Sequence, residues 1–236
     1  MTSRRRFKVG LIARALGLVL TVALLATGAG AAETDRLGRL DRADFRGEQP
    51  SADARRVGNW IVHSHDHGGM PFVVVDKLDS RVFVFDGRGR LRGTAPALMG
   101  LAQGDDSVAG IGDRKMSSIR PEERTTPAGR FVASVGRSLN GDEILWVDYD
   151  AAIALHRVIA TAPKERRLQR LESRKPQDRR ITYGCINVPT KFFDEIVLPA
   201  FRGGTGIVYV LPETRNSTTE FGSYEVEEQV DGPLSR

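Results

Sequence analysis

The sequence predicts a mainly β domain with a few helices, built as a β-sandwich or as barrel-like sheets. Runs of β-branched and aromatic residues alternate with turns rich in Asp, Gly and Ser through the middle of the chain, which is typical of paired strands. Only one segment there carries the apolar spacing of a clear helix. About 205 residues follow an N-terminal export signal, which suits one domain with a full core.

Seven segments are expected to form strands. They are residues 72–75, 81–85, 90–92, 130–135, 143–149, 151–158 and 206–211. The short turns DKLDS and DGRG make a meander of the first three. The pair Asn140-Gly141 supplies a tight turn between the fourth and the fifth.

A single clear helix is expected near the C-terminal end of the domain. It covers KFFDEIVLPAF, from Lys191 to Phe201, with Thr190 as its N-cap. Its apolar face consists of Phe192, Phe193, Ile196 and Val197.

Residues 1–31 have the form of an export signal peptide. A basic start precedes an apolar core of 12 residues, Ala15–Ala26, and the small residues Ala29–Ala31. The core is shorter than the roughly 20 residues that span a membrane, so we expect cleavage and no stable membrane span. An uncleaved anchor is the alternative. After cleavage, the mature protein is expected to be periplasmic or otherwise extracytoplasmic. The choice between the Sec and the twin-arginine export routes is left open.

Three regions are expected after the signal. Residues 32–56 predict a polar leader or linker, residues 57–213 the folded domain, and residues 214–236 an acidic tail. The whole chain has 35 basic and 30 acidic residues, and five basic residues but no acidic one lie in the signal. The remaining chain therefore balances at 30 of each, so its high pI gives no indication of nucleic-acid binding.

Cys185 is the only cysteine of the chain. It cannot form an internal disulfide, which leaves an intermolecular link, a reactive thiol or a buried, inert side chain. Gly184 allows a sharp turn, so that neighbouring backbone amides converge on one point as an oxyanion site requires. His156, at the end of an apolar strand, is the candidate base for the thiol, with an ordinary half-buried histidine as the alternative.

These residues resemble the catalytic motif of the L,D-transpeptidases of bacterial cell walls, the YkuD-type family. In that family a histidine precedes a Ser/Thr-His-Gly-Cys-hydrophobic-Asn segment, and this chain has His156 followed by Thr182–Asn187 (TYGCIN). Thr126–Phe131 (TPAGRF) is similar to the family's Thr-Pro-x-Gly-x-aromatic segment, and Phe72–Phe85 to its opening hairpin. The likeness runs from about Pro71 to Leu211 and implies a YkuD-like fold for the domain.

The resemblance implies a cysteine-dependent acyltransferase acting on peptidoglycan stem peptides. Cys185 would be the nucleophile that forms an acyl-enzyme, and His156 the general base. The residues implied to shape the site and its oxyanion hole are Thr182, Tyr183, Gly184 and Asn187. Transfer to an amine gives a transpeptidase and transfer to water a carboxypeptidase; a cysteine hydrolase or a non-catalytic wall-binding module of the same fold are further alternatives. No metal or organic cofactor is implied, and the oligomeric state is left open.

Two features depart from the family pattern. Tyr183 replaces the histidine before Gly-Cys, and a phenol with a pKa near 10 is no base at neutral pH. The spacer between His156 and Thr182 has 25 residues, longer than usual. Between Lys164 and Arg180 it holds eight basic and three acidic residues.

The basic spacer has two interpretations. It is either a lid over the cleft or a solvated charged loop. As a lid, it would bind stem carboxylates through Arg166, Arg167 and Arg170. Leu168 and Leu171, three residues apart, predict a short helix within it.

The stretch HSHDHGG, residues 63–69, resembles the histidine-rich metal ligand set of metallo-β-lactamase-type hydrolases. It is one residue short of that pattern, and His156 is the only histidine downstream. We therefore expect no functional zinc, although alternate histidines on a strand would allow adventitious metal binding.

Overall fold

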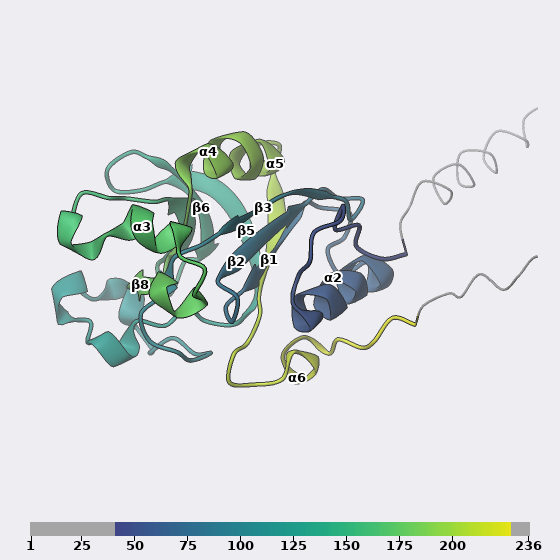
Figure 1. Ribbon diagram of the computed structural model, residues 1–236, viewed down its shortest axis with the longest axis horizontal. Helices are drawn as coiled ribbons and strands as arrows, with labels where there is room; N and C mark the ends of the chain where they lie inside the picture. Colours follow the sequence, from purple (N-terminus) through teal and green to yellow (C-terminus); the bar gives the residue numbers. More distant parts are fainter. Residues whose placement is uncertain (1–40, 228–236) are drawn as a thin grey trace, which may run out of the picture. The chain divides into compact units, whose positions relative to one another are not determined.

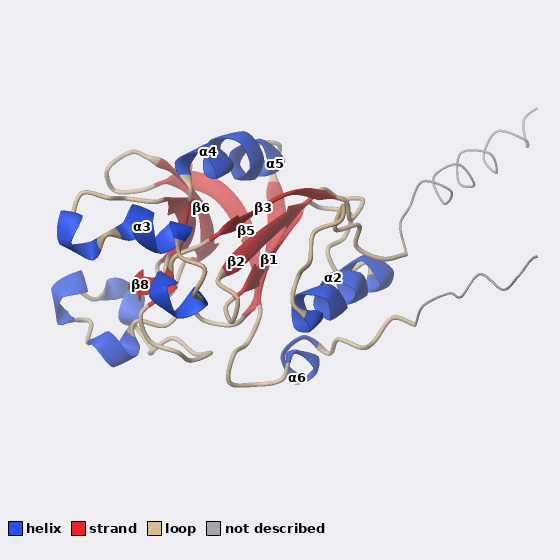
Figure 2. Cartoon of the chain, in the orientation of Figure 1, coloured by secondary structure: helices blue, strands red, loops and turns tan. Residues whose placement is uncertain are grey.

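One large mixed β-sheet organises the chain. A computed structural model describes residues 41–227 (Figure 1). The sheet has eight strands in the order β3-β2-β1-β10-β5-β6-β7-β9, and a second sheet pairs only β4 with β8. The large sheet is strongly curved, almost barrel-shaped, and few helices accompany it (Figure 2). The expected mainly β class is confirmed.

Seven of the strands lie where the sequence predicted them. The strands are β1 (Phe72–Asp76), β2 (Arg81–Phe85), β3 (Leu91–Pro96), β4 (Met99–Gly100), β5 (Gly129–Arg137), β6 (Glu143–Asp148), β7 (Ile153–Arg157), β8 (Arg180–Thr182), β9 (Ile186–Val188) and β10 (Thr205–Val210). The sequence did not predict β4, β8 and β9, because two or three residues are too short to show a period. Most pairs are antiparallel, whereas β1–β10, β7–β9 and β4–β8 are parallel.

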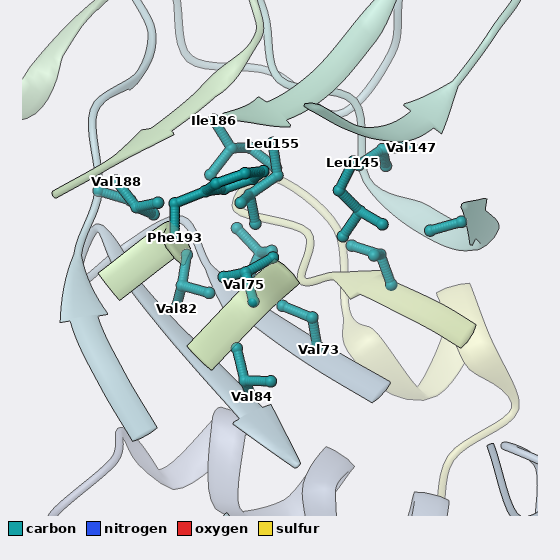
Figure 3. Close-up of a cluster of buried hydrophobic side chains, with 14 of the residues drawn as sticks. Val73, Val75, Val82, Val84, Leu145, Val147, Leu155, Ile186, Val188 and Phe193 are labelled. Atoms are coloured by element: carbon teal, nitrogen blue, oxygen red, sulfur yellow. The ribbon is translucent and has the colours of Figure 1, made fainter. Parts of the chain in front are cut away.

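Side-chain alternation gives the sheet two apolar faces. On the first face, residues from seven strands form a closed core with the helical segment 190–201. Phe193 lies at the centre of this core, among Leu155, Ile186 and Val188 (Figure 3). Burying a large side chain in such a core stabilises the fold by about 1.5–3 kcal/mol.

The expected C-terminal helix is present but is not a regular α-helix. It consists of α4 (Thr190–Phe192), a π-helical turn (Phe193–Val197) and α5 (Leu198–Phe201). Pro199, in α5, has no N–H to donate to the carbonyl four residues earlier, so the α-helical hydrogen-bond ladder is incomplete there. The expected N-cap was wrong, since Pro189 occupies the cap position and Thr190 is the first helical residue.

Helix α2 (Ala52–Ser64) covers the second face of the sheet over β1, β2 and β10. Its N-cap residue is Ser51, whose hydroxyl accepts a hydrogen bond from the Ala54 amide at 3.1 Å. The expected leader over residues 32–56 therefore overlaps a helix, and its boundary falls inside α2. Polar residues dominate the start of α2, which is why its amphipathic character was missed. Phe45 also packs edge-on against Phe83 and Phe85 of β2.

The chain after β10 returns to α2. Helix α6 (Ser217–Phe221) lies beside α2 (Figure 1), where Phe221 stacks on Trp60 with ring centroids 6.4 Å apart. The segment expected as an acidic tail is thus packed on the domain at least as far as Tyr224, which bonds His63. The expected signal peptide lies outside the described residues. Within residues 41–227, no helix has the length and apolar character to cross a membrane.

Short helical turns occupy the long connections. They are η1 (Ile111–Asp113), η2 (Met116–Ser118) and η3 (Pro121–Glu123) before β5, and η4 (Pro163–Glu165), α3 (Arg167–Glu172) and η5 (Pro176–Arg179) between β7 and β8. The short helix expected in the basic spacer is confirmed as α3. Its Leu171 is buried, whereas Leu168 is 55% exposed.

Candidate active site

Parallel pairing of β7 with β9 brings His156 beside Asn187. Leu155 pairs with Ile186 and His156 with Asn187, and the first of these pairs lies in the core. Alternation therefore directs His156 and Asn187 to the opposite face. Cys185 directly precedes β9, and the charge of Arg167 acts on both the Cys185 thiol and the His156 ring. The predicted nucleophile and base therefore lie near the same guanidinium.

Two threonine hydroxyls hold the cysteine loop, the segment Thr182–Cys185 that joins β8 to β9. Thr182 Oγ1 donates to the Cys185 carbonyl at 2.7 Å and accepts from the Gly184 amide at 3.1 Å. Thr126 Oγ1 donates to the Gly184 carbonyl at 2.7 Å and accepts from the Gly100 amide at 2.9 Å. Gly184 has φ +133°, a conformation that favours glycine. The TPAGRF segment therefore fixes the loop that carries the cysteine.

The Cys185 thiol is half-buried and lies 3.7 Å from the Ala152 carbonyl. Burial raises the pKa of the thiol, while the Ala154 backbone N–H and the positive charge of Arg167 lower it in part. Since the pKa is raised overall, the thiol is protonated at neutral pH in this arrangement.

Both ring nitrogens of His156 have hydrogen-bond partners. Nδ1 lies 2.7 Å from the Arg157 carbonyl, and Nε2 lies 3.0 Å from Nδ2 of Asn187. Burial lowers the pKa of His156; the Arg157 carbonyl opposes this shift and the charge of Arg167 adds to it. Among the hydrogen bonds of residues 41–227, none joins His156 to the Cys185 sulfur. The site thus holds a neutral imidazole and a neutral thiol.

One of the three spacer arginines reaches the site. Arg167 Nη1 donates to Oδ1 of Asn187 at 2.8 Å, and its Nε donates to Glu165 at 2.6 Å. Arg166 bonds Gln169, and Arg170 bonds the backbone carbonyls of Glu165 and Asp178. That any of them binds a substrate carboxylate stays a prediction.

Tyr183, the residue before Gly184 and Cys185, packs against a guanidinium. The Arg124 guanidinium lies 3.9 Å from the centroid of the Tyr183 ring, and it also donates to the Ile119 carbonyl. Such stacking fixes the phenol ring. Arg124 was missed by sequence reasoning, because a single arginine far along the chain carries no sign of this contact.

A buried ion cluster supports the segment that holds the cysteine loop. Lys77 Nζ donates to Asp105 at 2.7 Å and to the carbonyls of Gly104 and Thr126 at 2.7 and 3.0 Å. Burial by itself would raise the pKa of Asp105, but hydrogen bonds from Lys77, Thr214 and backbone amides outweigh it and hold that pKa far below its usual range. Sequence reasoning placed Lys77 in an ordinary turn.

The three clustered histidines lie at the end of α2 and in the turn after it, so placing them on a strand was wrong. His63 Nδ1 contacts the Tyr224 hydroxyl at 2.9 Å. His67 is buried, with its ring nitrogens each 3.1 Å from a carbonyl, one of Ile61 and one of Gly87. In the described part of the chain, no three His, Cys, Asp or Glu side chains gather in a group that could hold a metal ion.

Comparisons with known proteins gave matches only among solved structures. No family model and no curated protein matches the sequence. Three similar structures are the L,D-transpeptidase LdtMt1 in complex with imipenem (16% identity, TM-score 0.33), an L,D-transpeptidase from Mycobacterium smegmatis (15%, 0.32) and one from Xylanimonas cellulosilytica (14%, 0.34). Each match covers 60% of this chain and 58–60% of the solved chain, less than two thirds of its length.

Proposed function

We propose that this protein is a cysteine-dependent acyltransferase of the L,D-transpeptidase type. It forms an acyl-enzyme with a peptidoglycan stem peptide at Cys185 and transfers the acyl group to an amine. Because the substrate lies in the cell wall, the proposal includes export to the periplasm or another extracytoplasmic location.

The convergence of three separate sequence segments carries the proposal. The Thr126 hydroxyl of the TPAGRF segment bonds the Gly184 carbonyl at 2.7 Å. The His156 ring contacts the Asn187 amide at 3.0 Å. A histidine, a cysteine loop and the segment that braces the loop thus gather from distant parts of the chain. Nucleophilic catalysis requires this assembly of nucleophile, base and fixed backbone.

The reaction uses the thiol and the imidazole in turn. Cys185 Sγ attacks the carbonyl carbon before a terminal D-residue, and the thiol proton passes to His156 Nε2. The new S–C bond forms, the amide C–N bond breaks, and His156 returns the proton to the leaving amine. An acceptor amine then attacks the thioester, gives its proton to His156, and releases the thiolate, which is reprotonated.

Two local adjustments accompany this chemistry. Nε2 accepts the thiol proton only after the Asn187 amide has moved away from it, since an imidazole nitrogen offers one lone pair in its plane. The Gly184 amide already donates to Thr182 Oγ1. The oxyanion role therefore falls to the amides of Tyr183 and Cys185.

A non-catalytic wall-binding module is the second candidate. The occupied nitrogens of His156 and the raised pKa of the Cys185 thiol favour it, since an enzyme that used a preformed ion pair would hold both groups charged. Tyr183 in place of the family histidine points the same way.

Mass spectrometry of the purified protein mixed with a disaccharide tetrapeptide tests the proposal. We expect an acyl adduct on Cys185, none in Cys185→Ala, and acylation slower by roughly two to four orders of magnitude in His156→Ala. His63→Ala, which changes an exposed histidine, is the matched control with wild-type acylation. An added amine acceptor yields a new amide for a transpeptidase, whereas only hydrolysis indicates a carboxypeptidase. No adduct, with equal sedimentation of wild type and Cys185→Ala on purified peptidoglycan, establishes the binding module instead.

A further inference from the structure

We propose that Arg167 is a positioning residue: acting through the Asn187 amide, it fixes the proton of His156 on Nδ1 and keeps Nε2 as the basic nitrogen. Arg167 begins α3 in the basic spacer, and its side chain is 14% exposed. Its consequence for catalysis rests on the proposed function, whereas its effect on the histidine ring does not.

The guanidinium first sets the orientation of the Asn187 amide. Arginine only donates hydrogen bonds, so the atom that faces Nη1 of Arg167 at 2.8 Å must be the amide oxygen. The amide nitrogen of Asn187 is then directed at His156. Asn187 is 1% exposed, so water does not provide an alternative partner for either end of the amide.

The amide in turn sets the tautomer of the imidazole. Nδ2 of Asn187 is a donor, so Nε2 of His156, 3.0 Å away, must be the unprotonated nitrogen. The proton is then on Nδ1, which donates to the Arg157 carbonyl at 2.7 Å. In the other tautomer, the N–H at Nε2 would face the donating amide of Asn187, and the unprotonated Nδ1 would face the Arg157 carbonyl oxygen. In the imidazolium, the N–H at Nε2 would again face the Asn187 donor.

The charge of Arg167 also favours the neutral ring of His156, whereas the charge of Asp142 opposes it. Arg167 is the cation whose charge lowers the pKa of both His156 and the Cys185 thiol. Asp142, from the turn before β6, raises the pKa of His156. Glu165 holds the guanidinium in place through Nε at 2.6 Å. Among these groups, only Arg167 combines a positive charge with a hydrogen-bonded route to the ring.

Nitrogen NMR of the imidazole ring tests the proposal without any substrate. The His156 signals are assigned by their loss in His156→Ala. In the wild type we expect a protonated Nδ1 and an unprotonated Nε2. Arg167→Gln should give a mixture of tautomers and a titration midpoint at higher pH, and Arg167→Lys should return both toward wild type because it restores a cationic donor. Arg174→Gln, which removes an exposed cation of the same segment, should change neither.

A second variant covers the case in which Arg167→Gln does not fold. Asn187→Asp keeps the shape of the side chain but presents an acceptor to Nε2, so the proton should move to Nε2 and the titration midpoint should rise. A folded Arg167→Gln with the wild-type tautomer and midpoint would overturn the proposal. So would an Asn187→Asp protein whose Nε2 stays unprotonated, or an equal change in Arg174→Gln.

Acylation provides the catalytic arm. In Arg167→Gln, the acid limb of Cys185 acylation should move to higher pH, because His156 is protonated more readily and loses its role as base there. The rate at alkaline pH should be largely kept, which a merely structural role of Arg167 would not produce. If even the wild type forms no adduct, the proposed function fails while the NMR result still decides the role of Arg167.

Discussion

Replacing Gly184 by alanine tests how tightly the cysteine loop is built. A Cβ at this position would lie 2.6 Å from the Thr125 carbonyl oxygen and 2.6 Å from Cδ1 of Ile153. The first of these neighbours is backbone, which cannot rotate away. The backbone also has φ +133°, which L side chains rarely adopt. Gly184→Ala therefore carries both a steric and a conformational cost.

The two costs have separate magnitudes. Holding a residue with a side chain in a glycine conformation costs about 1–3 kcal/mol. Forcing an extra methyl group into packed surroundings costs about 1–3 kcal/mol. The expected loss in free energy of unfolding is their sum, about 2–6 kcal/mol, a large part of the roughly 5–15 kcal/mol typical of a domain.

Urea denaturation of three glycine variants separates the two contributions. Gly141 has φ +87° and no atom near its missing Cβ, so Gly141→Ala carries only the conformational cost. Gly203 has no near neighbour and lies outside the left-handed region, so Gly203→Ala should be neutral or stabilise by about 0.4–1 kcal/mol. We expect Gly184→Ala to be the least stable of the three. Equal unfolding free energies for Gly184→Ala and Gly203→Ala would refute the geometry of the loop.

Three further predictions concern buried charge and thiol reactivity. Lys77→Met should lower the free energy of unfolding by about 3–5 kcal/mol, because it leaves the Asp105 carboxylate buried without its cation; an unchanged urea midpoint would contradict this. The pKa of Asp105 is lower in the folded protein than in the unfolded chain. The stabilisation from its carboxylate is therefore complete above the ordinary carboxyl pKa of about 3.9 and is lost as pH falls toward the folded pKa. The free energy of unfolding of Asp105→Asn should thus depend less on acid pH than that of the wild type. The rate of Cys185 alkylation should rise with pH, with a midpoint above the ordinary thiol pKa of about 8.5, because burial raises the pKa of this thiol. A rate already at its plateau near neutral pH would instead indicate a thiolate paired with an imidazolium.

The fold was predictable where runs of β-branched and aromatic residues mark strands that are buried on both faces. The FVVV and RVFVF runs gave β1 and β2 because their residues lie between two apolar layers. Helix α2 was missed because its exposed residues are charged and polar, and its apolar face is recognisable only once β1 and β10 are there to bury it. Strand β9 has three residues, and its pairing with β7 depends on tertiary contacts rather than local propensity.

The candidate site was predictable as a set of residues but not as a hydrogen-bond network. The motif placed Cys185, His156 and Asn187 in one constellation, and the parallel register of β7 and β9 brings the latter two together. It did not predict that the Asn187 amide would occupy His156 Nε2, because an amide side chain donates or accepts according to what lies at its other end.

The role of Arg167 shows why charge counting stops short of a mechanism. The spacer holds several arginines of equal charge, and the sequence leaves open which apolar residue anchors them. The burial of Leu171 rather than Leu168 selects the face of α3 that turns inward, and Arg167, four residues before Leu171, lies on that face. Arg166 precedes the helix with φ +52°, so the chain turns there and Arg166 remains exposed. Had Leu168 been the anchor, the inward face would have carried Glu172, four residues later, instead. The choice between two leucines thus decides whether a guanidinium or another side chain reaches Asn187, and with it the proton position on His156.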